Sequence, residues 1–503
     1  MKPCSNPALY RGLLASALAL TLAGCAIQPQ ALTPDERQAA VQDGLARMFS
    51  EQEPVQGPVT LEEAMARAIK YNLDHRVKLM EEAVARRQLD VSGIDLLPRL
   101  ALQAGYTGRD NELASSSRDI VTGTQSLVPS TSSDRRHGTT DLSLSWNVLD
   151  FGVSYYSARQ QGDRWFATQE RRRKVVHLLM QQTRQAYWQA AGAQQLEGKI
   201  SPVLDQARAA LADARKVEAE KLRSPLEALN YQRQLLEIVR QLEGMRDDLA
   251  QAKPRLASVM NLQPGQAFTV ALSPAMDTPA VRLPTAGMEE AALLRRPELV
   301  EAQYNERIGV LETRKALARL LPGLELSLGS HQDSNSFLVN DTWNEVGVRI
   351  SWNLLNVFNA GTIRGLAQAQ LDVARQQRLA LNMAVLTQVH LAHLDYLARA
   401  RQYDLSQQSN TVEQRILQQT RNAASANMQG KLEEIRAATS AMTAELRLYQ
   451  SYGSLQGAYG QVIATLGLDP LPDSVPAHDL KTLGDSVRAS EKAWTQVVNP
   501  GGA

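Results

Sequence analysis

The chain has 503 residues, and its 54 lysines and arginines almost balance its 53 aspartates and glutamates, which leaves a formal net charge of +1. This balance gives no electrostatic reason to expect a nucleic-acid partner. No apolar run approaching about 18 residues follows Cys25, so no membrane-spanning helix is expected beyond it, and any crossing of a membrane would fall to strands.

Residues 1–24 have the pattern of a signal peptide: a positively charged start, then an apolar core at residues 12–22 that is too short to span a bilayer permanently. The segment ends in Leu-Ala-Gly-Cys, which resembles a bacterial lipobox and implies a lipid on Cys25. Ala26, in place of Asp, implies the outer membrane. The alternative is an ordinary signal peptide followed by a chance cysteine. Because Cys4 leaves with the signal, no disulfide is expected.

Three segments are read as connections because they are polar and rich in proline. Residues 25–59 form a lipidated N-terminal tether with one short helix at 35–49. Residues 265–285 link the two halves of the chain. Residues 471–503 form a tail with a possible helix near 480–497.

The chain contains itself twice. A shift of about 206 positions aligns Ser145-Trp146-Asn147 with Ser351-Trp352-Asn353, and the alignment continues to the end of each copy. Upstream the shift is about 224, so the first copy holds roughly 18 extra residues between Pro98 and Ser145. We call residues 60–264 the first repeat and 286–470 the second repeat. Two copies of one unit predict a pseudo-twofold protomer.

Each repeat is predicted to run helix, two strands, long helix, shorter helix. The first helix covers 60–96, beginning at Thr60 with a capping-box glutamate three residues on, and its counterpart covers 286–319. The long helix covers 154–220, about 100 Å. Helices 60–96 and 225–262 then lie end to end alongside it. Pro202 predicts a break in the first long helix, and the second lacks it.

Side chains at three- and four-residue spacing mark the packed face of each long helix. The stripe is small and weakly apolar in the first repeat and more apolar in the second: Leu179, Thr183, Ala186, Ala190 and Ala193, against Val385, Val389, Ala392, Tyr396 and Tyr403. Such thin apolar seams suit the wall of a water-filled tube better than a compact core.

Four segments alternate apolar and polar side chains and predict strands: 99–107, 142–148, 324–329 and 345–354. Strands of about ten residues with one apolar face are what a transmembrane barrel requires. Trp146 and Trp352, near strand ends, suit an interfacial aromatic belt. A soluble half-buried sheet would show the same local pattern, and the exported, lipidated context favours the membrane. Since a barrel needs about eight strands, several protomers must share one.

The turn at the far end of each helical hairpin is marked by Ser224-Pro225-Leu226-Glu227, an N-cap pattern with proline at the first helical position. Its counterpart is Gly430–Glu433. Asn427 and Gly430 tolerate a left-handed backbone there.

On these features the chain resembles the lipoprotein branch of the TolC-like outer-membrane factor (outer-membrane efflux protein) family. The motifs are the Leu-Leu-Pro-x-Leu strand entries at 96–100 and 320–324, the two Ser-Trp-Asn strand exits, and Leu-Gly-Leu-Asp-Pro at 466–470. The resemblance implies a mostly α protomer with a transmembrane β part, four strands plus long α-hairpins. Three copies would build a 12-stranded β-barrel on a 12-helix periplasmic α-barrel.

The resemblance also implies functional residues at the hairpin tips. Family members often carry Val-Asp-Val-Leu-Asp-Ala at the tip, where the acids constrict the pore; here residues 432–437 are Leu-Glu-Glu-Ile-Arg-Ala. The expected constriction residues are Glu433, Arg436, Glu434 and Glu227, with a Glu433–Arg436 pair available. The expected adaptor contacts are Leu222, Arg223, Ser224, Asn427, Met428 and Gly430. The implied partners are two further copies of the chain, a periplasmic adaptor, an inner-membrane pump and outer-membrane lipid.

The expected function is a passive exit duct of a tripartite system, for small-molecule efflux, with type I protein secretion as the alternative. An alternative of another class is a non-channel periplasmic coiled-coil lipoprotein or an adaptor. The sequence has no Walker loop, His-Glu-x-x-His or nucleophile elbow, so neither an enzyme nor a cofactor is expected. His390 and His393 could bind a metal, but ordinary surface histidines are expected. The basic run 171–174 is interpreted as a solvated face just inside the barrel mouth rather than a site for an anionic partner.

Overall fold

The structure, a computed structural model, describes residues 30–220, 224–272, 276–423, 428–472 and 475–500. The chain divides into two units, Met1–Pro54 and Val55–Ala503. In the first unit, helix α2 (Pro34–Met48) begins with a capping box: Thr33 accepts a hydrogen bond from the Glu36 N–H, and the Glu36 carboxylate accepts one from the Thr33 N–H at 2.8 Å. The helix predicted at 35–49 is therefore confirmed, and none of its described residues is buried.

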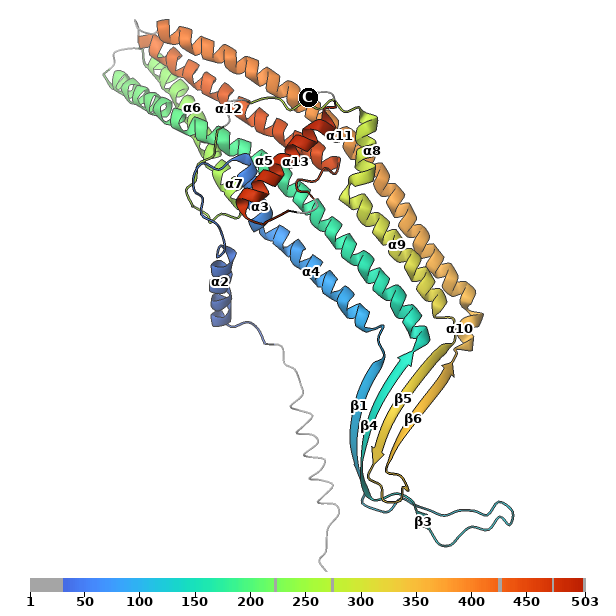
Figure 1. The fold of residues 1–503 in the computed structure, drawn as a ribbon. Coiled ribbons are helices and arrows are strands. Elements are labelled where there is room, and N and C mark those ends of the chain that lie inside the picture. Colours follow the sequence, from blue (N-terminus) through green and yellow to red (C-terminus); the bar gives the residue numbers. More distant parts are fainter. Residues whose placement is uncertain (1–29, 221–223, 273–275, 424–427, 473–474, 501–503) are drawn as a thin grey trace, which may run out of the picture. The chain divides into compact units, whose positions relative to one another are not determined.

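In the second unit the predicted order of elements occurs twice (Figure 1). The first series is α3 (Leu61–Tyr71), α4 (Leu73–Ile94), β1 (Arg99–Gly108), β2 (Ala114–Ser115), β3 (Ser130–Thr131), β4 (Arg136–Asn147), α5 (Val148–Ala219), α6 (Pro225–Ala250) and α7 (Ala252–Val259). The second is α8 (Thr285–Arg295), α9 (Pro297–Ala318), β5 (Gly323–Asp333), β6 (Thr342–Ser351), α10 (Leu354–Phe358), α11 (Ala360–Ala423) and α12 (Met428–Thr465). Helix α13 (Leu480–Val498) follows, where a helix was predicted.

The helices form a layer in which two long helices each run beside shorter ones. Helix α5 packs on α4 and α9 toward the sheet and on α6 and α12 toward the opposite end (Figure 1). Helix α11 packs on α9 and then on α12. The predicted arrangement is therefore present: each long helix packs on two shorter helices that follow one another along its length.

The first helix of each repeat is in fact two helices. Asn72, with ψ 127°, ends α3 and caps α4, because its side chain accepts a hydrogen bond from the His75 N–H at 3.2 Å. In the second repeat, Arg296 takes the extended conformation that favours a following proline, and Pro297 begins α9. The prediction of single helices over 60–96 and 286–319 was wrong at these two positions.

The start of α3 contains half of the predicted capping box. The Thr60 hydroxyl accepts a hydrogen bond from the Glu63 N–H at 3.2 Å. The Glu63 carboxylate instead accepts one from Arg67 Nε at 2.9 Å. Arg67 is 1% exposed, so this ion pair gives a buried guanidinium a charged partner, which a backbone cap would not have done.

A proline leaves one helix of the first repeat continuous and divides another. Helix α5 is continuous for 72 residues through Pro202, so the predicted break is wrong; it also begins earlier than predicted, at Val148. The buried side chains of Ile200 and Leu204 hold it on either side of the proline. The helix predicted over 225–262 is split at Gln251, because Pro254 at the third position of α7 lacks an N–H and crowds the preceding turn.

The four predicted strands form one antiparallel sheet in the order β1-β4-β5-β6, and β4–β5 is the pair that joins the two repeats. The prediction was wrong at two strand ends, because Val148 begins α5 and Leu354 begins α10. Asn147 explains the first change: its side chain accepts hydrogen bonds from the N–H groups of Leu149 and Asp150, each at 3.1 Å, and so caps α5.

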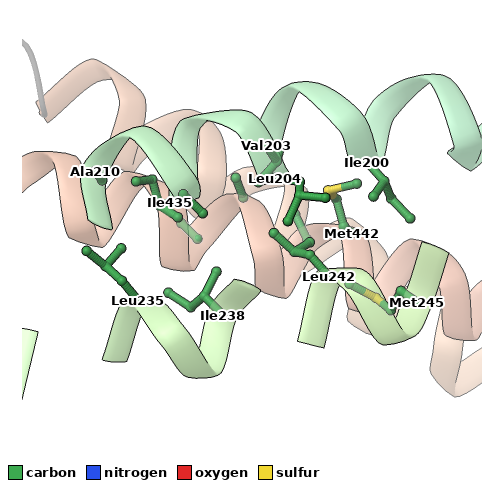
Figure 2. Packing of buried hydrophobic residues seen from close by; sticks show 14 of the residues in the cluster. Ile200, Val203, Leu204, Ala210, Leu235, Ile238, Leu242, Met245, Ile435 and Met442 are labelled. Atoms are coloured by element: carbon green, nitrogen blue, oxygen red, sulfur yellow. The ribbon is translucent and has the colours of Figure 1, made fainter. Parts of the chain in front are cut away.

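The core lies between helices, and one of its two largest clusters lies at the end away from the sheet. There a cluster of buried side chains joins α5, α6 and α12, including Leu204, Leu235, Leu242, Ile435 and Met442 (Figure 2). Both predicted stripes of the long helices are buried throughout. Full burial of one such leucine contributes about 1.5–3 kcal/mol.

Candidate functional site

The sheet gathers apolar side chains of all four strands on one face. Its register places Leu100 beside Leu144, Leu144 beside Leu328, and Leu328 beside Val346, so one apolar row crosses the whole sheet. Leu100 is 66% exposed and Val346 76% exposed. The chain therefore leaves this face uncovered, along strands of 10 to 12 residues, a length that spans a bilayer core.

The opposite face is polar. One row runs Gln103, Asp141, His331 and Trp343 across the four strands. His331 Nδ1 lies 2.6 Å from Asp141 Oδ1, and the His331 ring stacks on Trp343 with the centroids 5.2 Å apart. The two faces therefore differ in chemistry as a membrane-facing and a water-facing surface would.

The two tryptophans of the predicted belt lie at the ends of the sheet nearest the helices. Trp146 pairs with Leu326 in the register of the apolar face and is 37% exposed. Trp352 follows the last residue of β6 and is 52% exposed, and its indole Nε1 donates to the Leu320 carbonyl at 3.0 Å. An exposed tryptophan whose indole N–H has a hydrogen-bond acceptor is typical of a side chain that lies at a membrane–water interface.

The two outer helices of the layer also carry exposed apolar stripes. On α4 the stripe consists of Leu73, Val77, Met80, Val84, Val91 and Ile94. On α11 it consists of Val373, Met383, Leu391, Leu394, Leu405 and Val412, on the face opposite to the buried Val385–Tyr403 stripe. A helix with apolar side chains on two faces packs on two sides, and here only one side is packed.

At the hairpin tips, Arg436 is the centre of a polar contact between the two repeats. Its Nη1 lies 2.7 Å from Glu433 Oε1, which is the i,i+3 pair the sequence made available. Its Nη2 donates to Gln234 Oε1 on α6. Gln241 Nε2 on α6 donates to Thr443 Oγ1 on α12 at 2.9 Å, in the same seam. The structure therefore brings Arg436 to the seam between α6 and α12, with Glu433 exposed beside it.

The other tip residues lie apart from that seam. Glu434 contacts Arg421 of α11 at 3.6 Å, and Glu227 is exposed in the first turn of α6. Ser224 is the N-cap of α6, but its side chain makes no capping hydrogen bond, so that part of the prediction was wrong. Gly430 lies in the first turn of α12 rather than in a left-handed turn.

Some predicted site residues fall outside the part of the chain that the structure describes. These are Cys25, Leu222, Arg223 and Asn427. Met428 is the first residue of α12, and nothing further is described for it.

The sequence did not reveal a polar network where α12 ends. Asp469 Oδ1 lies 2.9 Å from His177 Nε2, and Arg173 Nη2 donates to Asp469 Oδ2 at 2.7 Å. Trp494 of α13 donates to the Asp469 carbonyl at 2.9 Å. Partial burial would raise the pKa of Asp469, but the hydrogen bonds from His177 and Arg173 outweigh it, so the pKa lies below its ordinary value. The end of the second repeat is thus tied to α5 and to the C-terminal helix.

The basic run at 171–174 belongs to the helix layer and not to a barrel mouth. It lies in α5 about 35 Å beyond the last strand residue, at 1.5 Å per residue. Its members pair with carboxylates of neighbouring elements: Arg171 with Glu301, Arg172 with Glu82, Arg173 with Asp469, and Lys174 with Glu298. Arg171 and Lys174 are still 51% and 59% exposed, so the predicted solvated face is retained in part, with an acidic partner for each cation.

Two further observations limit the chemistry of the described residues. His390 Nε2 lies 2.6 Å from Glu289 Oε1, and within the described ranges no group of three His, Cys, Asp or Glu side chains is arranged to hold a metal. Among those same residues, every helix is too short or too polar to qualify as a membrane span.

The sequence matches no protein-family model and no curated protein. Solved structures share its fold. The CmeC outer membrane channel of Campylobacter jejuni has a TM-score of 0.62 and 14% identity, over 94% of this chain and 97% of that one. CusC, solved for its folding and transmembrane channel formation, has a TM-score of 0.62 and 18% identity, over 88% and 100%. The outer-membrane channel OprN has a TM-score of 0.60 and 20% identity, over 81% and 89%.

The chain therefore has the protomer fold of outer-membrane channels, which is the fold that its resemblance to the TolC-like outer-membrane factors implies.

Proposed function

We propose that the chain is the outer-membrane channel subunit of a tripartite export system and acts as a passive exit duct. The observation that carries the proposal is the apolar row across β1, β4, β5 and β6, exposed on a sheet whose two edge strands each pair on one side only. Exposed edge strands and an exposed apolar face are both unfavourable in water. Closure of the sheet with further copies, inside a bilayer, removes both.

Three copies satisfy these requirements better than two. Two copies supply eight strands, and side chains just fill the interior of an eight-stranded barrel. Three copies supply 12 strands, and a barrel of that size leaves a lumen. The exposed stripes of α4 and α11 lie on the two outer helices, so the α4 stripe of one copy can pack on the α11 stripe of the next. Such a head-to-tail contact closes a ring under threefold symmetry. We therefore propose a homotrimer with a 12-stranded barrel and a 12-helix tunnel.

The anchor and the partners follow from the same proposal. Lipid on Cys25 would hold the tether at the outer membrane, while the apolar face of the sheet supplies the membrane insertion. Helices α6 and α12 begin at the end of the helix layer away from the sheet. We assign the hairpin tips, residues 222–224 and 427–430, to contacts with a periplasmic adaptor and an inner-membrane pump. The seam between α6 and α12 would have to open for passage, and Arg436 joins its two sides.

We assign small-molecule efflux as the transported class, with type I protein secretion as the alternative; the pump encoded beside this chain would distinguish the two. The non-channel coiled-coil lipoprotein is the less favoured alternative, because such a protein has no use for an uncovered apolar sheet face.

Reconstitution in planar bilayers tests the proposal directly. The purified chain in detergent should have the mass of three copies and form discrete ion-conducting channels. A variant in which Val346 and Val348 are changed to Arg should lose membrane insertion, since arginines on a lipid-facing strand cost about 2–4 kcal/mol each near the midplane. A monomeric mass, or normal insertion of that variant, would contradict the proposed barrel.

A further inference from the structure

The extra residues of the first repeat form a defined hairpin, and not an irregular loop. Strands β2 and β3 pair, and the Ser126 N–H and Asp119 N–H donate to the Ser117 and Thr124 carbonyls, each at 2.8 Å. We call residues 114–131 the arm. Figure 1 shows it turning away from the line of the four long strands.

The tip of the arm is held by its own hydrogen bonds. Asp119 Oδ1 accepts from the N–H groups of Val121 and Thr122 at 2.8 Å, and Gly123 has φ +68°. These bonds hold the pKa of Asp119 below its ordinary value. Arg118 Nε donates to the Gly123 carbonyl at 2.9 Å. The turn is therefore fixed and its charged groups already have partners.

The base of the arm is tied to the second connection of the sheet. Asn335, 8% exposed, accepts a hydrogen bond from the Asp134 N–H at 3.0 Å and donates to the Ser132 carbonyl at 3.1 Å. The Ser336 hydroxyl donates to Asp134 Oδ1 at 3.0 Å. Arg135 also pairs with Glu112 at 2.6 Å. A hairpin with a fixed turn and a fixed base holds its direction.

This rigid hairpin presents apolar side chains to water. Ile120 is 99% exposed, Val121 93%, Leu127 96% and Val128 76%. Ile120 and Val121 lie in the turn, and Leu127 and Val128 lie on the returning side of the arm. Large apolar residues exposed along a fixed hairpin indicate a contact surface. Residues 114–131 contain one cation, Arg118, which is bonded within the turn, one anion, Asp119, and no aromatic residue. Segments that rest on a membrane surface are rich in lysine and arginine and carry aromatic anchors, so a single arginine held within the turn favours a protein contact.

The reach of the arm matches the distance to the axis of the proposed barrel. A 12-stranded cylinder with strands about 4.8 Å apart and a tilt of about 40° has a radius of about 12 Å. The six steps from Ala114 to Ile120 span about 20 Å when extended. An arm that leans over the mouth therefore reaches the axis. The second repeat has only residues 334–341 at this place, so a trimer has three arms.

We propose that the arms of three copies of this chain meet over the outer mouth of the channel and narrow it through contacts among Ile120, Val121, Leu127 and Val128. The proposal rests on the proposed trimeric channel. Because the contact is apolar and uncharged, it would exclude ions and hydrated solutes until the arms separate. The outer mouth would then have a constriction of its own, apart from the one at the hairpin tips.

Disulfide cross-linking of the full-length lipoprotein tests the proposal. Ile120→Cys should give a covalent dimer within the native trimer on oxidation, because two of three thiols at the axis can pair. Val339→Cys, 98% exposed on the short second connection, is the matched control and should give none, as should the parent chain. Ile120→Ser combined with Val121→Ser should raise single-channel conductance without changing the trimer mass.

The outcomes separate the two proposals. An intact trimer that gives no covalent dimer and keeps the parent conductance in the double serine variant overturns the arm contact and leaves the channel standing. Quenching of a fluorophore at position 120 by brominated lipids in vesicles would place the arm in the membrane and also overturn it. A monomeric mass overturns both proposals, and covalent species larger than a trimer show contact between channels instead.

Discussion

The helix that returns from the tip is continuous in the second repeat and divided in the first. Helix α12 lies between α5 and α11, with neighbours on both sides, whereas α6 and α7 accompany α5 at a border of the layer. At Gly453, Gly457 and Gly460 an added Cβ would lie 3.3–3.4 Å from the nearest atoms of Gln189, Gln185 and Gln181 on α5. The inner helix therefore uses glycines to let a neighbouring helix approach.

The equivalent positions of the first repeat, about 206 earlier, are Asp247, Gln251 and Pro254. A charged side chain and a proline are tolerated there because the border helix has solvent on one side. The equivalent helices of the two repeats thus differ according to their position in the layer. Close packing requires glycine in the inner helix α12, whereas the border helices α6 and α7 tolerate a break.

Substitutions at the equivalent positions 460 and 254 test this difference between the inner and the border helix, and they have the largest expected effect. Gly460→Pro should cost about 3 kcal/mol or more, because a proline in a helix interior removes a hydrogen bond and clashes with the preceding turn, here against α5. Thermal unfolding in detergent, followed by circular dichroism, measures the loss. Pro254→Ala is the matched control and should leave the midpoint unchanged or raise it. Equal destabilisation by both substitutions would refute the difference between inner and border helices.

A second pair of equivalent positions, Asn261 and Gly467, ends the returning helices with left-handed backbone, at φ 58° and 69°. Gly467→Ala should lower stability by about 1–3 kcal/mol, because its Cβ would lie 2.7 Å from the Arg295 carbonyl carbon as well as in a strained conformation. Asn261→Gly keeps the conformation and should change stability by less. The same thermal assay compares them, and an unaffected Gly467→Ala midpoint would show that the close approach to α8 is not maintained in solution.

The Asp469 carboxylate that joins the end of the second repeat to α5 has no equivalent in the first repeat, where the same position is Gln263. Asp469→Asn should cost about 1 kcal/mol at pH 7, a modest value since the carboxylate is 38% exposed and partly screened. The folded pKa of Asp469 is lowered from 3.8, so its stabilisation is present above that value and is lost as the pH falls through the folded pKa. The difference between wild type and variant should therefore shrink below about pH 4. A difference that is constant from pH 7 to pH 3 would exclude the charge as its cause.

Periodicity located the strands and the long helices because their patterns are long and regular. The ten-residue alternations and the Val385–Tyr403 stripe depend on neighbours within one element, which the sequence contains in full. Local signals failed where tertiary packing decided. Pro202 leaves α5 unbroken because Ile200 and Leu204 are buried on either side of it, and Asn72 divides a helix that its apolar pattern would continue.

For the candidate site, the sequence supplied the residues but few of their partners. Glu433 and Arg436 are three residues apart, so their pair was foreseeable. Gln234, about 202 positions from Arg436, and His177, about 292 from Asp469, were not, because no pattern in one sequence connects positions so distant. The acidic partners of the basic run 171–174 were not foreseeable for the same reason, because they come from three other segments.

The smallest expected effect on stability, and the most specific effect on conductance, belongs to the tip, where Glu433 of the second repeat corresponds to Glu227 of the first. The Glu433–Arg436 pair is 60% and 40% exposed, and such i,i+3 pairs contribute about 0.3–0.5 kcal/mol. Its contact with Gln234 nevertheless joins α12 to α6, so Arg436→Ala should raise the resting conductance by removing a link across the seam. Glu433→Gln should lower cation selectivity, because in the proposed trimer three carboxylates at a narrow passage would attract cations with little screening.

Glu227→Gln is the matched control for these tip variants, since Glu227 occupies the equivalent position and lies exposed at the start of α6. We expect it to change selectivity less than Glu433→Gln does, in the same bilayers and at the same ionic strength. The contrast should narrow as salt is raised, because the Debye length falls from about 10 Å at 0.1 M to about 3 Å at 1 M. If Glu433→Gln and Arg436→Ala both leave conductance and selectivity at wild-type values, other residues form the constriction and the α6–α12 seam has only a structural role.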